Sequence, residues 1–364
     1  MIGGARMENL VVFAHAKIGH LVPAPLRKWL RWVLYPSGSA QPKMLVIDTV
    51  GACNLRCPSC AVGNMGVGFN PTGIMDIELF RSVIKKAKHD HGVRVVALFN
   101  WSEPFLNPRL AQFVGIVKAE NMRCTISSNL NLMRDVDSVL EAGLDIFRVS
   151  LSGFTQENYG QSHVRGDIDK VKANMRLLRA AIDRTRTKPI VEVYFHKYLH
   201  NLGEVEQMRA LVVELHFSWL ENWAYYMPME KVLAAGNGEL SATEQKFVDE
   251  KLALPITEAL AAAGSLDGYD RCTLLEDQIV LDHNANVLLC CTVYDFKNNG
   301  LGTFMEMSEA DLKRMKSCHP TCTTCTSKGL QKYFTYSEIP ELRDRYDALA
   351  KAKVASRQLN KNTA

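Results

Sequence analysis

The ten cysteines of this 364-residue chain form two groups with spacing typical of metal ligands. Three lie between Cys53 and Cys60, six lie between Cys272 and Cys325, and Cys124 stands alone. Long gaps separate the groups, unlike the even scatter in a small secreted fold stapled by disulfides. Clustered thiols that stay reduced usually bind metal in the cytoplasm, which is the compartment we expect for this chain.

The first group has the spacing Cys-x3-Cys-x2-Cys on one loop, formed by Cys53, Cys57 and Cys60. Three thiolates suit three irons of a [4Fe–4S] cluster, which cysteine normally holds. The fourth iron would keep an open position for a substrate or cofactor, as catalytic metal sites do. A structural zinc ion would need a fourth ligand, and the nearest candidates in sequence are His89 and His91. The cluster is therefore the favoured interpretation.

The second group supplies four thiolates for a closed site. Cys272 and Cys290 flank a predicted hairpin, and Cys322 and Cys325 form a Cys-x2-Cys pair. Such a set holds either a second [4Fe–4S] cluster or a tetrahedral zinc ion, and spacing does not separate the two. Cys291 is an alternative ligand to its neighbour Cys290.

Two cysteines fall outside both ligand sets. Cys318 either forms a partial further site or has no role. Cys124 lies on a predicted core strand, so we predict that it is buried like a small hydrophobic residue.

Strands that alternate with helices must position these loops. Between Met44 and Leu215, short β-branched runs alternate with amphipathic stretches. The predicted strands are Met44–Val50, Val93–Asn100, Arg123–Ser127, Asp145–Ser150, Ile190–His196 and Phe217–Met227. The predicted helices are Asp76–Lys88, one from Pro108, Leu132–Ala142, Ile168–Thr185 and Leu202–Leu215. This alternation predicts an α/β fold with parallel strands and right-handed crossovers, in an open sheet or a barrel.

The pattern changes after Met227. Met229–Ala263 is predicted to be helical, Gln278–Asp282 and Val287–Cys291 to form a β-hairpin, and Ile339–Val354 to be a helix. We therefore predict four parts: an N-terminal helical extension (1–43), a barrel (44–228), a linker with a cysteine-rich domain (229–340), and a C-terminal helix and tail (341–364).

Composition excludes several classes of protein. The chain is 47% hydrophobic and 23% charged, which is typical of one large domain, or one domain plus a smaller one. A net charge of +4 gives no argument for a nucleic-acid partner. There is no secretory signal and no apolar run of the ~20 residues that a membrane span needs. Val11–Leu34 is predicted to be a helix docked on the main domain, with a membrane-surface helix as the alternative.

The cysteine loop after the first strand resembles the hallmark of the radical SAM superfamily. The resemblance covers Met44 to about Met227 and implies a partial (β/α)6 barrel. It implies that S-adenosylmethionine binds at the open iron and is cleaved to a 5′-deoxyadenosyl radical, which abstracts hydrogen from a substrate. Trp101-Ser102-Glu103-Pro104 is similar to the family's Gly-Gly-Glu-Pro segment, in which Glu103 would bind the methionine amino group.

Further motifs follow at successive strand ends, where barrel enzymes build their sites. The resemblance implies that the cofactor is contacted by Glu103, Ser128, Asn129, Ser150, Ser152 and Arg165, with the arginine reaching the methionine carboxylate. Ser59 stands where the family usually has an aromatic residue against the adenine, so that contact must come from elsewhere.

The second cysteine group resembles the truncated "twitch" form of the SPASM extension, which carries an auxiliary [4Fe–4S] cluster. Ala285 stands where that pattern usually has Gly. A full SPASM extension would need further cysteines after Cys325, and the sequence has none.

The resemblance implies an oxidoreductase-type enzyme that takes electrons from a flavodoxin or ferredoxin. Only about 43 residues precede the first strand, which favours a small polar or saccharide substrate, as in carbohydrate dehydrogenases of aminoglycoside biosynthesis. The product would arise by oxidation or epimerisation. The alternative is a peptide-modifying (RiPP maturase) enzyme, and a more distant one is a non-catalytic zinc or redox-sensing module.

Aromatic and polar residues near the sixth strand form a candidate substrate pocket: Tyr194, His196, His200, Trp219, Glu221, Asn222, Trp223 and Tyr226. Most of them could instead pack between the barrel and the extension. Oxidation of an alcohol needs a proton acceptor, and the candidates are His196 and Glu221.

Overall fold

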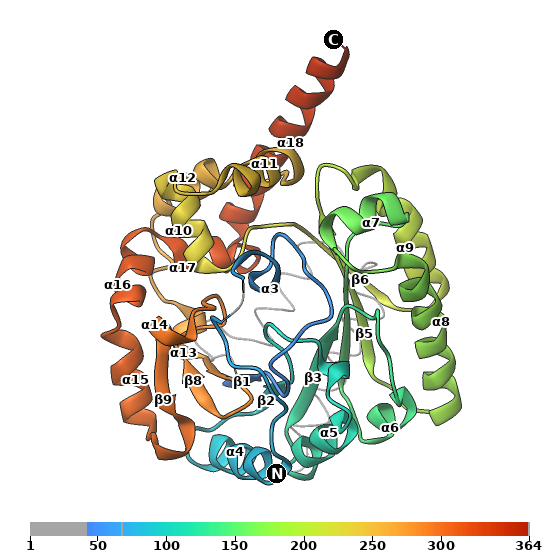
Figure 1. The fold of residues 1–364 in the computed structure, drawn as a ribbon, viewed down its shortest axis with the longest axis vertical. Helices are drawn as coiled ribbons and strands as arrows, with labels where there is room; N and C mark the ends of the chain where they lie inside the picture. The colour runs from blue at the N-terminus through green and yellow to red at the C-terminus, as the bar shows by residue number, and fades with distance from the viewer. Residues whose placement is uncertain (1–41, 67, 363–364) are drawn as a thin grey trace. The chain divides into compact units, whose positions relative to one another are not determined.

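A curved nine-stranded sheet is the centre of the structure, a computed structural model that describes residues 42–66 and 68–362 (Figure 1). The strand order is β6-β5-β4-β3-β2-β1-β7-β8-β9. Six strands pair in parallel: β1 (Met44–Ile47), β2 (Val95–Ala97), β3 (Arg123–Ser128), β4 (Ile146–Leu151), β5 (Ile190–Lys197) and β6 (Ser218–Trp223). The predicted partial (β/α)6 architecture is therefore confirmed. The predicted helix over Val11–Leu34 lies outside the described residues.

Helices cover the outer face of this sheet (Figure 1). They are α4 (Ile77–His89), α5 (Leu110–Ala119), α6 (Val136–Glu141), α8 (Ile168–Thr185) and α9 (Val205–Glu214). The face that α4 turns to the strands is apolar. Its buried residues, such as Phe80, Val83 and Ile84, recur at helical spacing. Asp167 caps α8, since its carboxylate accepts hydrogen bonds from two amides of the first turn.

Several shorter elements were not predicted from the sequence. They are α3 (Ala61–Asn64), α7 (Gln156–Ser162), and the 3-10 helices η1 (Pro104–Leu106) and η2 (Leu202–Glu204). The helix expected from Leu132 begins four residues later, at Val136. Asp135, immediately before it, has a φ of 47°, and this left-handed conformation is incompatible with a continuous helix.

The predicted hairpin is present and extends the barrel sheet. β7 (Gln278–Leu281) pairs in parallel with β1, in register from Met44↔Gln278 to Ile47↔Leu281. β8 (Asn286–Leu288) and β9 (Gly300–Thr303) then add in antiparallel fashion. The hairpin turn contains Ala285 with a φ of 61°, a conformation that normally favours glycine. The Asp282 carboxylate stabilises this turn by accepting hydrogen bonds from the Asn284 and Asn286 amides.

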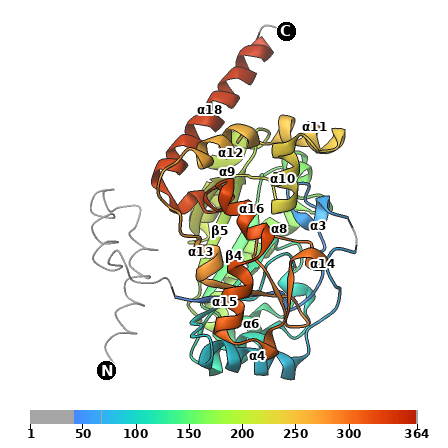
Figure 2. The same cartoon turned by 90° about the vertical axis from the view of Figure 1, so that its left-hand side faces the viewer.

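The rest of the C-terminal region is helical. Its helices are α10 (Met229–Asn237), α11 (Ala242–Lys251), α12 (Ile256–Gly264), α13 (Thr273–Glu276), α14 (Phe296–Asn299), η3 (Phe304–Glu306), α15 (Glu309–Ser317), α16 (Pro320–Ser327), α17 (Leu330–Phe334), η4 (Tyr336–Glu338) and α18 (Pro340–Asn362). α18 runs well past its predicted end at Val354, and Figure 2 shows its last turns extending away from the other helices. In the described part of the chain, no helix has the length and apolar character needed to cross a membrane.

Candidate functional site

The loop after β1 carries the first three cysteines and ends in α3. The Cys60 amide donates to the Cys57 carbonyl at 3.0 Å, and the Gly63 amide donates to the Cys60 carbonyl at 2.9 Å. A Cβ at Gly63 would lie 2.1 Å from the Cys57 carbonyl oxygen, so this tight turn requires glycine. All three thiols are partly buried. Burial raises the pKa of Cys53 to about 12 and that of Cys60 to about 11, a shift that binding of a metal to the thiolates would reverse.

Contacts from segments far away in the sequence fix this cysteine loop. The Arg56 amide donates to the Val164 carbonyl at 3.0 Å, and the Met227 amide donates to the Ser59 carbonyl at 3.0 Å. The Ser59 hydroxyl hydrogen-bonds the Tyr198 hydroxyl at 2.7 Å. An aromatic ring from the end of β5 therefore lies beside Ser59, the position where the resembling family usually has its own aromatic residue.

Neither cysteine group has the geometry of a site for a single metal ion. Among residues 42–66 and 68–362, no three or more Cys, His, Asp or Glu side chains are arranged to hold one metal ion. The ligands of a [4Fe–4S] cluster each bind a different iron, so they need not converge on a single point.

Glu103 is a buried carboxylate next to this loop. It is 2% exposed and accepts hydrogen bonds from the Ser128 hydroxyl (2.8 Å), the Asn129 amide (2.9 Å) and the Phe105 amide (3.2 Å). In the described residues no Lys, Arg or His side chain pairs with it. Burial raises the pKa of Glu103 to about 7. A buried carboxylate held only by neutral donors is suited to an ammonium group on a ligand.

Asp48, a residue that the sequence analysis did not select, holds the loop that leads to Glu103. Its carboxylate accepts hydrogen bonds from the backbone amides of Asn100 (2.8 Å), Trp101 (3.2 Å) and Ser102 (3.1 Å). The loop therefore keeps a tight backbone path with Trp101 and Ser102 where the family has two glycines. In the sequence, Asp48 lies inside the predicted strand Met44–Val50, whereas β1 ends at Ile47, so the only sequence signal was a carboxylate within a mostly apolar run.

The other predicted cofactor contacts occupy different environments. The Asn129 side chain donates to the Asn54 side chain at 2.8 Å, which joins the end of β3 to the cysteine loop. Arg165 is exposed and directly follows Val164, whose carbonyl contacts that loop. Ser150 hydrogen-bonds His196 Nε2 at 3.1 Å.

Ser152 is fully buried, and its hydroxyl bonds to Ser162 and to His163 Nδ1 (2.8 Å). In this structure Ser152 therefore stabilises the segment that precedes Arg165.

The inner face of β4, β5 and β6 carries a polar group of side chains. Arg148 forms an ion pair with Glu192 at 3.0 Å, and its guanidinium carbon lies 5.2 Å from the centre of the Tyr194 ring. The Asn222 amide donates to the Tyr194 hydroxyl. Burial, followed by the charge of Arg148, lowers the pKa of His196 to about 4, so its imidazole is neutral near pH 7. These side chains alternate with core residues along the strands and therefore share one face.

Glu221, on β6, lies on the opposite face of the sheet from His196, which is on β5. It is in register with Phe195, a core residue on the face covered by α9. Its carboxylate accepts hydrogen bonds from Trp219 Nε1 (2.8 Å), Arg209 Nη2 (2.8 Å) and Lys197 Nζ (3.3 Å). The structure thus does not bring the two candidate bases together, and Trp219 shares the outer face with Glu221.

The four thiols of the second group gather between β7 and α16. Cys272 precedes α13, Cys290 follows β8, and Cys322 and Cys325 lie three residues apart on α16. Burial raises the pKa of Cys272 and of Cys322 to about 11, and in both cases the Cys290 thiolate is the largest charge that adds to the shift.

The two remaining cysteines lie in opposite environments. Cys124 is fully buried in the core, as predicted. Cys318 is exposed at the end of α15.

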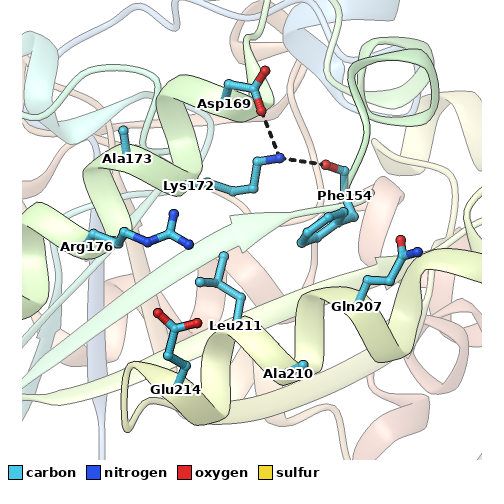
Figure 3. Close-up of a pocket in the computed structure, with 9 residues that line it drawn as sticks. All are labelled: Phe154, Asp169, Lys172, Ala173, Arg176, Gln207, Ala210, Leu211 and Glu214. Atoms are coloured by element: carbon cyan, nitrogen blue, oxygen red, sulfur yellow. Dashed lines mark hydrogen bonds and ion pairs between the residues drawn. The ribbon is translucent and has the colours of Figure 1, made fainter.

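A surface cavity of about 540 Å³ lies elsewhere, between α8 and α9 (Figure 3). Lys172 crosses it, with Nζ 2.8 Å from the Asp169 carboxylate and 3.1 Å from the Phe154 carbonyl. These helices cover the outer face of the sheet, so this cavity is not part of the site on the inner face.

Gly63→Ala is expected to prevent the cysteine loop from closing. The added methyl would overlap the Cys57 carbonyl, and overpacking of this kind costs about 1–3 kcal/mol. Anaerobic reconstitution should then yield about four fewer irons per chain than the unaltered protein. Gly115→Ala is the matched control, because a Cβ there meets open space. Equal iron content in both variants would contradict the assignment of this loop.

The comparison with protein families bears on the strands and loops just described. Residues 47–195 match the model of the Radical SAM superfamily. This segment, about two fifths of the chain, is a radical SAM domain. The matched range contains the cysteine loop, Glu103 and Arg165, and it ends before β6 and the second cysteine group.

Curated relatives share part of this domain. The GTP 3',8-cyclase of Chlorobaculum tepidum is 31% identical over 137 residues, which are 36% of this chain and 40% of that protein. The chain therefore spans well under half the length of this relative.

Two solved structures share the fold of the domain and extend beyond it. SuiB of Streptococcus suis bound to S-adenosylmethionine has a TM-score of 0.53 at 13% identity, covering 83% of this chain and 71% of that one. Native anSMEcpe with bound AdoMet has a TM-score of 0.51 at 15% identity, covering 85% of this chain and all of that one.

Proposed function

We propose that this chain binds S-adenosylmethionine at a [4Fe–4S] cluster held by Cys53, Cys57 and Cys60. When bound, the cluster and S-adenosylmethionine supply a 5′-deoxyadenosyl radical that abstracts hydrogen from a substrate. The observation that carries this proposal is Glu103, a buried carboxylate with no cationic partner among residues 42–66 and 68–362, whose amide donates to the carbonyl of Ala52, directly before Cys53, at 3.0 Å. The thiols fit a metal centre because their loop is pinned at both ends by backbone hydrogen bonds.

Residues of this chain would orient the cofactor. Glu103 would accept the methionine ammonium, and Arg165 would meet the carboxylate. Ser128 and the Asn129 amide hold the Glu103 carboxylate in place. Tyr198 would supply the aromatic surface that Ser59 lacks.

For the substrate we propose a small polar molecule, a sugar or sugar-like alcohol, that is oxidised or epimerised. The support is the inner face of β4–β6, where Arg148, Glu192, Tyr194 and Asn222 present charged and hydroxyl or amide groups that can hydrogen-bond a polyol. His196, neutral near pH 7 and on the same face, is the proton acceptor we favour. A peptide substrate is the alternative, because the structural neighbour SuiB has also been solved bound to the precursor peptide SuiA.

We further propose a twitch-type auxiliary [4Fe–4S] cluster on four thiolates: Cys272, Cys290, Cys322 and Cys325. Its role would be to take up an electron from the substrate, with a flavodoxin or ferredoxin as the external reductant and the cytoplasm as the compartment. The support is the placement of these thiols, with Cys272 directly before α13, Cys290 after β8, and Cys322 and Cys325 on α16, where the charge of Cys290 adds to the raised pKa of Cys272 and of Cys322.

Anaerobic reconstitution tests the proposal as a whole. Two [4Fe–4S] clusters give about eight irons per chain, and the reduced protein should release 5′-deoxyadenosine from S-adenosylmethionine. Candidate sugars and peptides labelled with deuterium identify the substrate class through label in the 5′-deoxyadenosine. A colourless protein that holds zinc and cleaves no S-adenosylmethionine would refute the enzyme proposal.

His196→Asn is expected to separate cofactor cleavage from product formation. Loss of a general base typically lowers turnover by 10²–10⁴-fold, while release of 5′-deoxyadenosine should continue because Glu103 and the cysteine loop are untouched. Product and 5′-deoxyadenosine are measured together by mass spectrometry. Glu221→Gln is the opposing arm: a loss confined to that variant would assign the base to the outer face instead.

A further inference from the structure

A lysine is buried beside the second cysteine group. Lys316 lies in the last turn of α15 and is 2% exposed. Its Nζ donates to the Gln278 carbonyl at 2.6 Å, and the Leu275 carbonyl lies 3.4 Å away. Within the part of the chain that the structure describes, no carboxylate lies within ion-pair distance of this ammonium. Its direct partners are therefore two neutral acceptors.

The charges that act most strongly on Lys316 belong to thiols. Burial lowers the pKa of Lys316, and thiol groups oppose that shift, in the order Cys290, Cys291, Cys322 and Cys272. Three of these four belong to the proposed auxiliary ligand set. The hydrogen bonds agree, because the Leu275 carbonyl that Lys316 approaches belongs to the turn whose Leu275 amide donates to the Cys272 carbonyl at 3.1 Å. The lysine therefore lies beside the segment where the thiolates of a metal centre would concentrate negative charge.

An ordinary surface role does not explain this position. Lys313, one turn earlier on the same helix, is exposed, as expected for a lysine on the polar face. Burying an ammonium without an anionic partner is costly, and the cost is offset when negative charge is close by. A four-thiolate metal centre is the anion that this region can assemble.

We propose that Lys316 is the charge partner of the auxiliary centre and raises the reduction potential of the cluster bound there. This inference rests on the proposed auxiliary cluster. Reduction adds one negative charge to the centre, and a fixed positive charge nearby favours the reduced form. Net charge and hydrogen bonding around the sulfurs are known determinants of such potentials.

Lys316→Gln tests the proposal, because glutamine removes the charge yet keeps an N–H donor for the two carbonyls. Lys313→Gln is the matched control, with the same change in net charge on the exposed side of α15. Redox titration followed by electron paramagnetic resonance gives the midpoint potential of each cluster. We expect Lys316→Gln to weaken reduction of the auxiliary cluster at least tenfold, a shift of about 59 mV to lower potential for one electron. The control and the first cluster should shift much less.

Two results would overturn the inference, and they are distinguishable. If the unaltered protein binds about eight irons and both lysine variants show equal auxiliary potentials, Lys316 is not the charge partner. If the unaltered protein binds only about four irons, the auxiliary cluster itself fails together with the inference. Should Lys316→Gln not fold, Lys316→Arg, which keeps the charge, must retain the original potential, and a shift in that variant would refute the proposal.

Discussion

Replacing Cys57 with alanine is expected to abolish reductive cleavage of S-adenosylmethionine while the auxiliary cluster remains. A [4Fe–4S] cluster with an open iron has only three protein ligands, so loss of one removes the centre at which the cofactor would bind. Iron content should fall from about eight to about four per chain, and 5′-deoxyadenosine should fall to background.

Cys318→Ala is the control for this experiment, because Cys318 is exposed and outside both ligand sets. That variant should keep its iron and its activity. Persistent cleavage in Cys57→Ala would show that the cofactor binds elsewhere in the chain.

Glu103→Gln is expected to weaken binding of S-adenosylmethionine by roughly 30-fold to several thousand-fold. Truncating one partner of a buried charge pair costs about 2–5 kcal/mol, and Glu103 is the buried carboxylate proposed to meet the methionine ammonium. Equilibrium binding to the reconstituted protein measures the effect. Glu141→Gln, an exposed substitution on α6, is the control and should bind the cofactor as the unaltered protein does.

The pH dependence of binding gives a second measure of the same residue. Burial raises the pKa of Glu103 to about 7, and only the charged carboxylate pairs with an ammonium. Affinity should therefore rise as the pH increases through about 7, and below that it should fall about tenfold per pH unit. Glu103→Gln should lack this dependence. Affinity that is independent of pH in the unaltered protein would contradict the proposed pairing.

Stability of the protein without ligand should depend on pH in the opposite sense. The folded-state pKa of Glu103 lies above its ordinary value of 4.5, so the stability that protonation contributes is fully present below about pH 4.5. It is lost as the pH rises through about 7.

The sequence predicted the barrel well because its signals are local. Helix Ile168–Thr185 was predicted at both ends, since Asp167 caps it and its apolar residues recur at helical spacing. The cysteine loop was located because its ligands are close together in the chain.

Features that depend on tertiary pairing could not be predicted in the same way. β7 joins β1 across the 230 residues of chain that separate them, and no local pattern encodes that pairing. The face occupied by Glu221 follows from its register with Phe195, and that register with a neighbouring strand cannot be read from the sequence of β6 alone. Lys316 would be expected on the surface of an amphipathic helix, and only packing against the Gln278 carbonyl reveals its burial.

The pairing of β7 with β1 has a mechanical consequence for the two proposed centres. Cys53 follows the end of β1, whereas Cys272 precedes the start of β7, which is parallel to it and in register over four residues. The segments that carry the two cysteine groups are thus tied to one hydrogen-bonded strand pair, which spans about 13 Å at ~3.3 Å per residue. Because a sheet ladder and not a hinge joins these segments, we expect the sheet to fix the distance between the two groups. That distance should stay constant when a substrate enters or leaves.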